Sequence, residues 1–185
     1  MILPIYTYGN TVLRKEAENI NEDYPNLQTL ITDMFETMHH ADGVGLAAPQ
    51  IGLSIRLLVI DLKALEEDAP ELAKFNVVMI NPEMLEMSEE EVEGNEGCLS
   101  IPGISEKVYR SEWIKIRYYD ANFKEHTEEF EGYIARVVQH EYDHLEGSLF
   151  TDHVNPIRRQ MIKSKLNGIA KGKTSCDYKV KTASK

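Results

Sequence analysis

The sequence is short of cysteine and of long apolar runs, and each shortage excludes a class of protein. Its two cysteines, Cys98 and Cys176, are too few for a disulfide framework and are typical of a reducing compartment. No apolar stretch reaches the ~20 residues that a membrane-spanning helix requires. Residues 1–5 lack the basic start and the apolar run of a secretory signal. We therefore expect a cytoplasmic protein that does not enter a membrane.

Acidic residues outnumber basic ones, but the excess is not uniform along the chain. The formal net charge is −11, yet residues 156–185 carry nine of the 20 Lys and Arg and a single acid, Asp177. That segment has a charge of about +8, which leaves about −19 for residues 1–155. An acidic body argues against DNA binding, whereas a basic C-terminal segment could contact RNA. The simpler interpretation of this segment, which we favour, is a solvated helix followed by disorder.

Hydrophobic periodicity predicts an α+β fold. With 42% hydrophobic and 28% charged residues in 185, the chain has the composition and length of one ordinary globular domain. We expect this domain to span residues 1–170 and to be followed by a basic, disordered tail over residues 171–185. The acidic stretch 62–74 is expected at the surface, with no role assigned. The predicted helices are 24–41, 132–145 and 156–168, and the predicted strands are 55–61, 77–80 and 114–118.

The most informative chemical pattern is His140-Glu141-Tyr142-Asp143-His144. On a helix, two histidines four residues apart lie on one face, so that two neutral imidazoles can hold the same ion. Glu141 lies beside them and could take a proton from a water molecule bound to that ion. The alternative is a chance match on a surface helix, which three fixed positions make rare. The pattern therefore predicts a single-metal hydrolase.

A catalytic ion needs a third protein ligand, and its identity separates classes of enzyme. One group of zinc proteases places a histidine where this chain has Phe150, and another recruits a later glutamate, but none follows Glu146. Asp152 and His153 remain formal alternatives. Cys98, which lies between glycine and polar residues, is favoured as the third ligand over its other interpretation as an inert packed thiol.

Three segments together resemble the signature motifs of peptide deformylases, in the same order. The resemblance covers roughly residues 2–167, with Val44 where isoleucine is common and Pro49 where threonine is frequent. It implies removal of the formyl group from the N-terminal methionine of nascent chains. It also implies an α+β fold with antiparallel sheets around a central helix that carries both histidines, and a C-terminal helix follows from the periodicity. The segments are Gly43-Val44-Gly45-Leu46-Ala47-Ala48-Pro49-Gln50, Glu96-Gly97-Cys98-Leu99-Ser100 and Gln139-His140-Glu141-Tyr142-Asp143-His144.

The resemblance also implies a role for each matching residue. Cys98, His140 and His144 would hold one ion and leave a position for the attacking water. Glu141 would accept the proton of that water and later deliver it to the departing amine. The side-chain amide of Gln50 and the backbone N–H of Leu99 would stabilise the negative charge on the formyl oxygen. Without the neighbouring motif, Gln50 would be interpreted as an ordinary polar loop residue.

Substrate recognition can be predicted from residues near these motifs. An extended peptide could pair with the backbone of Val44, Gly45, Pro102 and Gly103, because glycine permits a close approach of two main chains. The methionine side chain needs an apolar pocket, and three residues precede His140 on or beside the same helical face. They are Tyr133 and Val137, which would line the pocket, and Arg136, which would lie at its rim; core packing explains each equally well.

The sequence indicates the cofactor and the partners less directly than it indicates the site residues. One thiolate and two imidazoles suit Fe(II), Zn(II), Co(II) or Ni(II), and the resemblance favours Fe(II) in the cell, with zinc acceptable in purified protein. The expected partners are N-formyl-methionine peptides on the ribosome. Because this reaction is cotranslational, the basic final helix could contact ribosomal RNA through Arg158, Arg159, Lys163 and Lys165. No contact with DNA or with membrane is expected.

Two other functions compete with deformylation. A zinc endopeptidase has the same His-Glu-x-x-His pattern, but Phe150 and the missing late glutamate disfavour it. A binding or structural protein with an inactive metal site belongs to a different class. It predicts that replacing Glu141 changes no measurable property.

Overall fold

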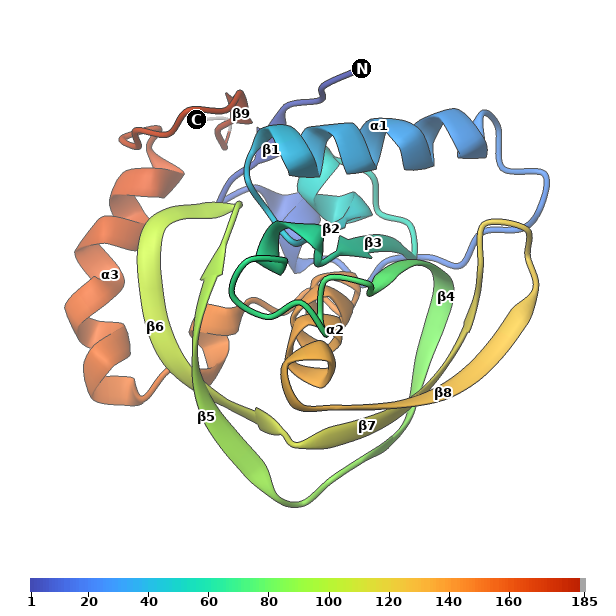
Figure 1. Cartoon of the computed structure of the whole chain (residues 1–185). Coiled ribbons are helices and arrows are strands. Elements are labelled where there is room, and N and C mark those ends of the chain that lie inside the picture. Colours follow the sequence, from blue (N-terminus) through green and yellow to red (C-terminus); the bar gives the residue numbers. More distant parts are fainter. Residues whose placement is uncertain (184–185) are drawn as a thin grey trace.

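The computed structural model describes residues 1–183, and at its centre lies helix α2 (Gly132–Leu145), surrounded by β-strands (Figure 1). Ala135, Val138 and Leu145 on this helix are fully buried. Helix α1 (Leu27–His40) covers one side of the molecule, and α3 (Pro156–Ala170) packs on the outside of strand β6 (Ile101–Ser111). The expected α+β fold with antiparallel sheets, a central helix and a C-terminal helix is confirmed. No helix among residues 1–183 is long and apolar enough to cross a bilayer.

The main sheet has five antiparallel strands in the order β2-β3-β4-β7-β8. Strand β3 is buried at every position and separates two cores, because alternate residues of a strand point to opposite faces. Leu58 and Ile60 pack in the core that includes α2, whereas Leu57 and Val59 pack in the core that includes α1. The strands are β2 (Gly45–Ala47), β3 (Leu57–Asp61), β4 (Asn76–Met87), β7 (Trp113–Tyr119) and β8 (Glu125–Glu131).

A second antiparallel pair, β5 (Glu91–Cys98) and β6 (Ile101–Ser111), forms a long hairpin beside α2. Its tight turn contains Leu99 and Ser100. The apolar face of β6 packs against α3, whose inward residues are Ile162, Leu166 and Ile169. Short 3-10 helices complete the fold: η1 (Thr11–Arg14), η2 (Ala48–Ile51), η3 (Lys63–Leu65) and η4 (Phe150–His153).

The C-terminal segment differs from the expected disordered tail. Strand β9 (Val180–Lys181) lies parallel to β1 (Ile5–Tyr6), and the Ile5 N–H donates to the Lys179 carbonyl at 2.9 Å. The side chain of Asn10 also donates to the Lys181 carbonyl at 2.9 Å. A strand of two residues has no period that a sequence could reveal, so this pairing escapes prediction. The last part of the predicted tail, residues 184–185, lies outside the described residues.

Two local features complete this description. The small residues of the 43–52 segment form strand β2 and the 3-10 helix η2. On α3, the side chains of Ile157 and Met161 are 74% and 63% exposed, so they lie away from the buried face of that helix.

Candidate metal centre and active site

Cys98, His140 and His144 come together where the end of β5 meets the C-terminal half of α2. Cys98 Sγ lies 3.4 Å from His144 Nε2, and one ligand atom from each of the three residues lies within 4.8 Å of the other two. The histidines project from one face of α2 because they are four residues apart. A shift in the β5–β6 register between Gly97 and Cys98 interrupts regular pairing just before the thiol. One thiol and two imidazoles at this spacing fit a divalent transition metal.

The alternative third ligands are engaged elsewhere. The Asp152 carboxylate accepts from the Arg14 guanidinium at 2.7 Å and from the Leu149 N–H at 3.0 Å. His153 Nε2 lies 2.9 Å from Asp143 Oδ2. Phe150, the position of the third histidine in one group of zinc proteases, is buried in the core beneath α3. Among the described residues, Cys98 is thus the third residue of the cluster.

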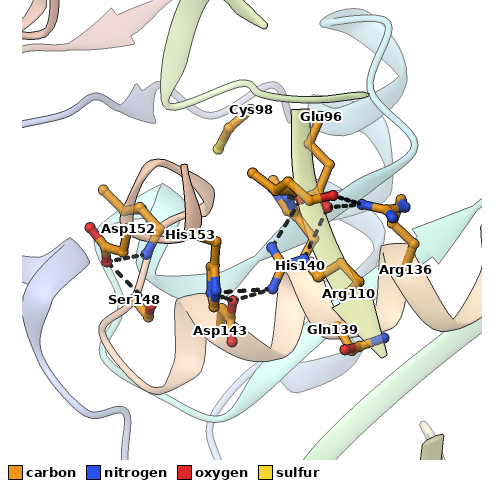
Figure 2. A network of polar contacts seen from close by, with 12 residues as sticks. Glu96, Cys98, Arg110, Arg136, Gln139, His140, Asp143, Ser148, Asp152 and His153 are labelled. Carbon is orange, nitrogen blue, oxygen red and sulfur yellow. Dashed lines mark hydrogen bonds and ion pairs between the residues drawn. The ribbon is translucent and has the colours of Figure 1, made fainter. Parts of the chain in front are cut away.

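A buried carboxylate, Glu96, orients His140 (Figure 2). Glu96 Oε1 lies 2.7 Å from His140 Nδ1, which leaves Nε2 of that ring as the ligand atom. The same carboxylate accepts two hydrogen bonds of 2.9 Å from Arg110 and one of 2.7 Å from Arg136. Burial alone would raise the pKa of Glu96, but the bonds from His140 and Arg110 outweigh it and hold that pKa well below its usual range. Glu96 therefore stays ionised and can hold its ring partner in one orientation.

The network around Glu96 continues away from the metal cluster. Arg110 also donates to Asp143, and Asp143 in turn bonds His153 near the surface (Figure 2). Gln139 holds α2 against the end of β6, since its side chain exchanges hydrogen bonds with both backbone groups of Ser111. These contacts fix the rotation of the helix that carries the histidines.

The two histidines have opposite electrostatic environments. Burial alone would lower the pKa of His140, but its contacts with Cys98 and Glu96 raise that pKa well above the usual value. Burial, together with the nearby His140, lowers the pKa of His144 to about 3. His144 is therefore neutral at physiological pH, and neutral imidazole is the form that binds metals. Its Nδ1 atom is buried and has no hydrogen-bond partner among residues 1–183.

Glu141 has the environment of a general base. Its side chain is buried, and Oε2 has no partner among the residues that the structure describes. Burial is the main cause that raises the pKa of Glu141 to about 7. A carboxyl group with a pKa near the working pH can both accept and return a proton. This buried, unpartnered oxygen next to a Cys-His-His cluster is typical of a hydrolytic site rather than a structural metal site.

Gln50 lies beside the metal cluster, with its amide held in one orientation. Its Oε1 accepts from the Ala47 N–H at 2.9 Å. Its Nε2 therefore points to the metal cluster and donates to Ser100 Oγ at 3.1 Å and to Cys98 Sγ at 3.5 Å. Leu99 lies between these two partners in the turn of the hairpin. Gln50 and Leu99 are thus brought to the same side of the cluster.

A cleft of about 640 Å³ opens over these residues. It is lined by residues of the 43–50 segment, of the β5–β6 hairpin and of α2. Cys98, His140 and Glu141 border it, and so do residues 175–178 of the C-terminal segment. All seven residues predicted to bind substrate line it: Val44, Gly45, Pro102, Gly103, Tyr133, Arg136 and Val137.

Sequence reasoning missed three features of the site. Glu96 lies two residues before Cys98, a spacing that places side chains on one side of a strand and could have indicated its role. Arg110 gave no such signal, because its contact with Glu96 depends on how β5 and β6 pair. The segment 175–178 is short and polar, and nothing in its composition indicates that it reaches the cleft.

Comparison with known proteins agrees with this geometry. The polypeptide deformylase family model matches residues 2–160. The peptide deformylase of Flavobacterium psychrophilum is 50% identical, with 100% of this chain and 99% of the relative covered. That of Christiangramia forsetii is 48% identical, with 98% and 96% covered. The crystal structure of the Legionella pneumophila peptide deformylase has a TM-score of 0.81 at 41% identity, with 92% of this chain and 96% of that chain covered.

Proposed function

The chain belongs to the polypeptide deformylase family, metal-dependent enzymes that remove the formyl group from nascent chains, and we propose which of its residues perform this reaction. The observation that carries the proposal is the buried, unpartnered carboxylate oxygen of Glu141 beside the Cys98, His140 and His144 cluster. These three residues hold the ion, and Glu141 moves the protons. The site does not support the zinc endopeptidase alternative. Among the described residues, neither a third histidine nor a glutamate completes the cluster, and Cys98 takes that place.

The ion is held by the Cys98 thiolate and by one nitrogen of each histidine. When bound, a divalent cation supplies Lewis-acid activation of a water molecule and of the formyl oxygen. We propose Fe(II) as the ion in the cell and Zn(II), Co(II) or Ni(II) as substitutes in purified protein. Thiolate and imidazole ligands suit all four ions, and the choice of iron rests on the family resemblance.

Glu141 accepts a proton from the attacking water and delivers it to the nitrogen of the departing amine, whose bond to the formyl carbon breaks as formate forms. As attack proceeds, negative charge develops on the formyl oxygen. The Gln50 amide and the Leu99 N–H stabilise this charge, because both are fixed before the substrate arrives. The bond from the Ala47 N–H to Gln50 Oε1 supports this role, since it orients the donor nitrogen to the cluster.

The substrate lies extended in the cleft between Val44–Gly45 and Pro102–Gly103. Its methionine side chain fills the space beside Val137 and Tyr133 on α2. Val137 is 6% exposed and Tyr133 39% exposed, which gives the pocket a buried end and an open rim. Arg136 lies at that rim, and its guanidinium donates hydrogen bonds to Glu96 and to the Val92 carbonyl.

We also propose that the enzyme acts in the cytoplasm and that α3 contacts ribosomal RNA. Lys163 and Lys165 are exposed on this helix, and exposed cations of this kind can replace the counterions of phosphates. Arg158 and Arg159 contribute less, because Arg158 pairs with Glu106 and Arg159 donates to the Asp152 carbonyl. Cosedimentation with ribosomes should fall when Lys163 and Lys165 are both replaced by Glu. Unchanged cosedimentation of this variant would contradict the proposed contact between α3 and ribosomal RNA.

Formate release from an N-formyl-Met dipeptide tests the proposed function directly. The metal-loaded protein should release formate from this peptide and leave the N-acetyl-Met analogue almost untouched, because an acetyl methyl group adds bulk at the reacting carbon. An internally cleaved, unformylated peptide in the same assay would indicate an endopeptidase instead. Absence of formate release by the metal-loaded protein would exclude the proposed roles.

A further inference from the structure

The C-terminal residues 175–178, which we call the C-terminal strap, form part of the cleft wall. They border the same cavity as Gly43, Gln50 and Glu141. Strand β9 follows the strap directly and fixes it to β1 by parallel pairing of Val180 with Ile5. Within the strap, the Cys176 thiol donates to the Tyr178 carbonyl at 3.5 Å. The strap is therefore held at a defined place next to the site.

The strap makes one specific hydrogen bond to the active-site hairpin. The Tyr178 hydroxyl donates to the Leu99 carbonyl at 2.7 Å. Leu99 follows the Cys98 ligand, and its N–H is one of the two donors proposed for the developing oxyanion. The Tyr178 side chain is only partly exposed, so its bond to Leu99 is shielded from solvent on one side.

Two further contacts hold the same turn. The Tyr8 N–H donates to the Ser100 carbonyl at 2.8 Å, and Gln50 Nε2 donates to Ser100 Oγ at 3.1 Å. Tyr8 lies just after β1, and Tyr178 lies just before β9. The segments that flank the paired strands β1 and β9 thus each supply one hydrogen-bond donor to the turn.

We propose that Tyr178 is a positioning residue for deformylation, which holds the Leu99–Ser100 turn so that the Leu99 N–H faces the formyl oxygen. This inference rests on the proposed function of the site. In this role Tyr178 acts through its bond to the Leu99 peptide and not through a contact with the substrate or the ion. Loss of its hydroxyl leaves the turn held by Tyr8 and Gln50 alone, so the donor is present but less well fixed. Such a defect weakens transition-state stabilisation more than substrate binding.

The test is Tyr178→Phe, with Tyr109→Phe as the matched control. Tyr109 also lies near the hairpin and donates to a carboxylate, that of Glu93 at 3.0 Å, but it lies outside the cleft. For N-formyl-Met-Ala-Ser, kcat should fall about 3- to 10-fold in Tyr178→Phe, the effect of one lost hydrogen bond, and KM should stay within about twofold. The control should keep both constants. Amide hydrogen exchange of residues 97–101 should accelerate in Tyr178→Phe and remain unchanged in the control.

The outcomes separate this inference from the proposed function. If the parent protein releases no formate, the proposed function fails, whereas the exchange measurement still reports on the turn. If the parent is active and Tyr178→Phe has parental kcat and parental exchange, the positioning role is wrong. A rise in KM with unchanged kcat would also overturn it, because Tyr178 would then be a binding contact of the cleft wall.

Discussion

The Glu141 carboxylate occupies the space that a side chain on Gly45 would need. A methyl group built on Gly45 would be 2.6 Å from Glu141 Oε1 and 2.9 Å from its carboxyl carbon. Gly45 lies in β2, whose residues are all buried, and it pairs with Ile60 of β3. Its backbone therefore cannot move away from Glu141. The requirement for glycine at this position of the 43–50 segment is therefore steric: only the absence of a side chain leaves room for the proposed base.

Gly45→Ala should lower kcat at least ~10-fold, because displacing a base by a fraction of an ångström misaligns proton transfer. Gly168→Ala is the matched control. Gly168 lies in α3, and its added methyl group would meet only ordinary contacts of 3.8 Å from Lys173. That control should retain parental kcat and unfold at an equal or slightly higher temperature. Parental kcat in Gly45→Ala would contradict this prediction, because the Glu141 carboxylate could then shift without any loss of activity.

Glu96→Gln should weaken metal binding by ~10- to 100-fold, the usual effect of removing a carboxylate that orients a metal-bound histidine. The substitution keeps the shape of the side chain but removes the negative charge that Arg110 and Arg136 share, which leaves Arg110 with Asp143 alone. Competition with a chelator, followed by the metal content of the protein, measures the affinity. Glu93→Gln, on the same strand but exposed, should bind metal as the parent does. Equal affinity in Glu96→Gln would mean that the carboxylate is not needed to orient His140.

The pair between Arg14 and Asp152 should make stability depend on acid pH. Burial alone would raise the pKa of Asp152, but the hydrogen bonds from Arg14 and the Leu149 N–H lower it below its usual value. A depressed folded-state pKa gives stability that is present above the unfolded pKa of ~3.9 and is lost as pH falls through the folded value. Asp152→Asn should therefore cost about 1 kcal/mol at pH 7, and its difference from the parent should shrink below the unfolded pKa.

Urea unfolding of the parent and Asp152→Asn between pH 3 and pH 7 measures this difference. The control is Asp68→Asn, because Asp68 is exposed and makes no side-chain hydrogen bond or ion pair among the described residues. It should differ from the parent by a small amount at every pH. A difference for Asp152→Asn that is constant across this range would mean that its charge is unimportant.

If Fe(II) is the native ion, activity should decay in air and persist under anaerobic conditions. Thiolates near a redox-active metal are oxidised, so catalase or a thiol reductant should slow the loss. Protein reloaded with Ni(II) or Zn(II) serves as the control and should keep its starting activity in air. Air-stable activity in protein shown to contain iron would contradict the proposed identity of the ion.

Local patterns in the sequence predicted the parts of the site that lie on one element or on a recognisable motif. The 132–145 segment was predicted as a helix, so the shared face of His140 and His144 followed from spacing alone. Cys98 was favoured because a catalytic ion lacked a third ligand, while Asp152 and His153 stayed open as alternatives until the structure showed their other partners. The strands 57–61, 76–87 and 113–119 were predicted in part, although β4 is much longer than its apolar centre at 77–80.

What the sequence could not predict depends on contacts between distant segments. The bond from Tyr178 to Leu99 joins residues 79 positions apart, and that from Arg110 to Glu96 requires the β5–β6 register. Strand β8 is polar at every position except Phe130, which gives little hydrophobic signal for a strand. The order expected to end at residue 170 continues because β1 supplies a backbone partner for β9. Long-range pairing of this kind leaves no periodicity in either segment.

The most direct test of the central claim compares Glu141→Ala with the parent for both metal content and formate release. If Glu141 is the base and not a ligand, the variant should hold one metal per chain and lose turnover by ~10²-fold or more. His140→Ala should lose metal and turnover together, which separates a ligand from a base. Turnover by metal-loaded Glu141→Ala at the parental rate would contradict the account, because proton transfer would then not depend on this carboxylate.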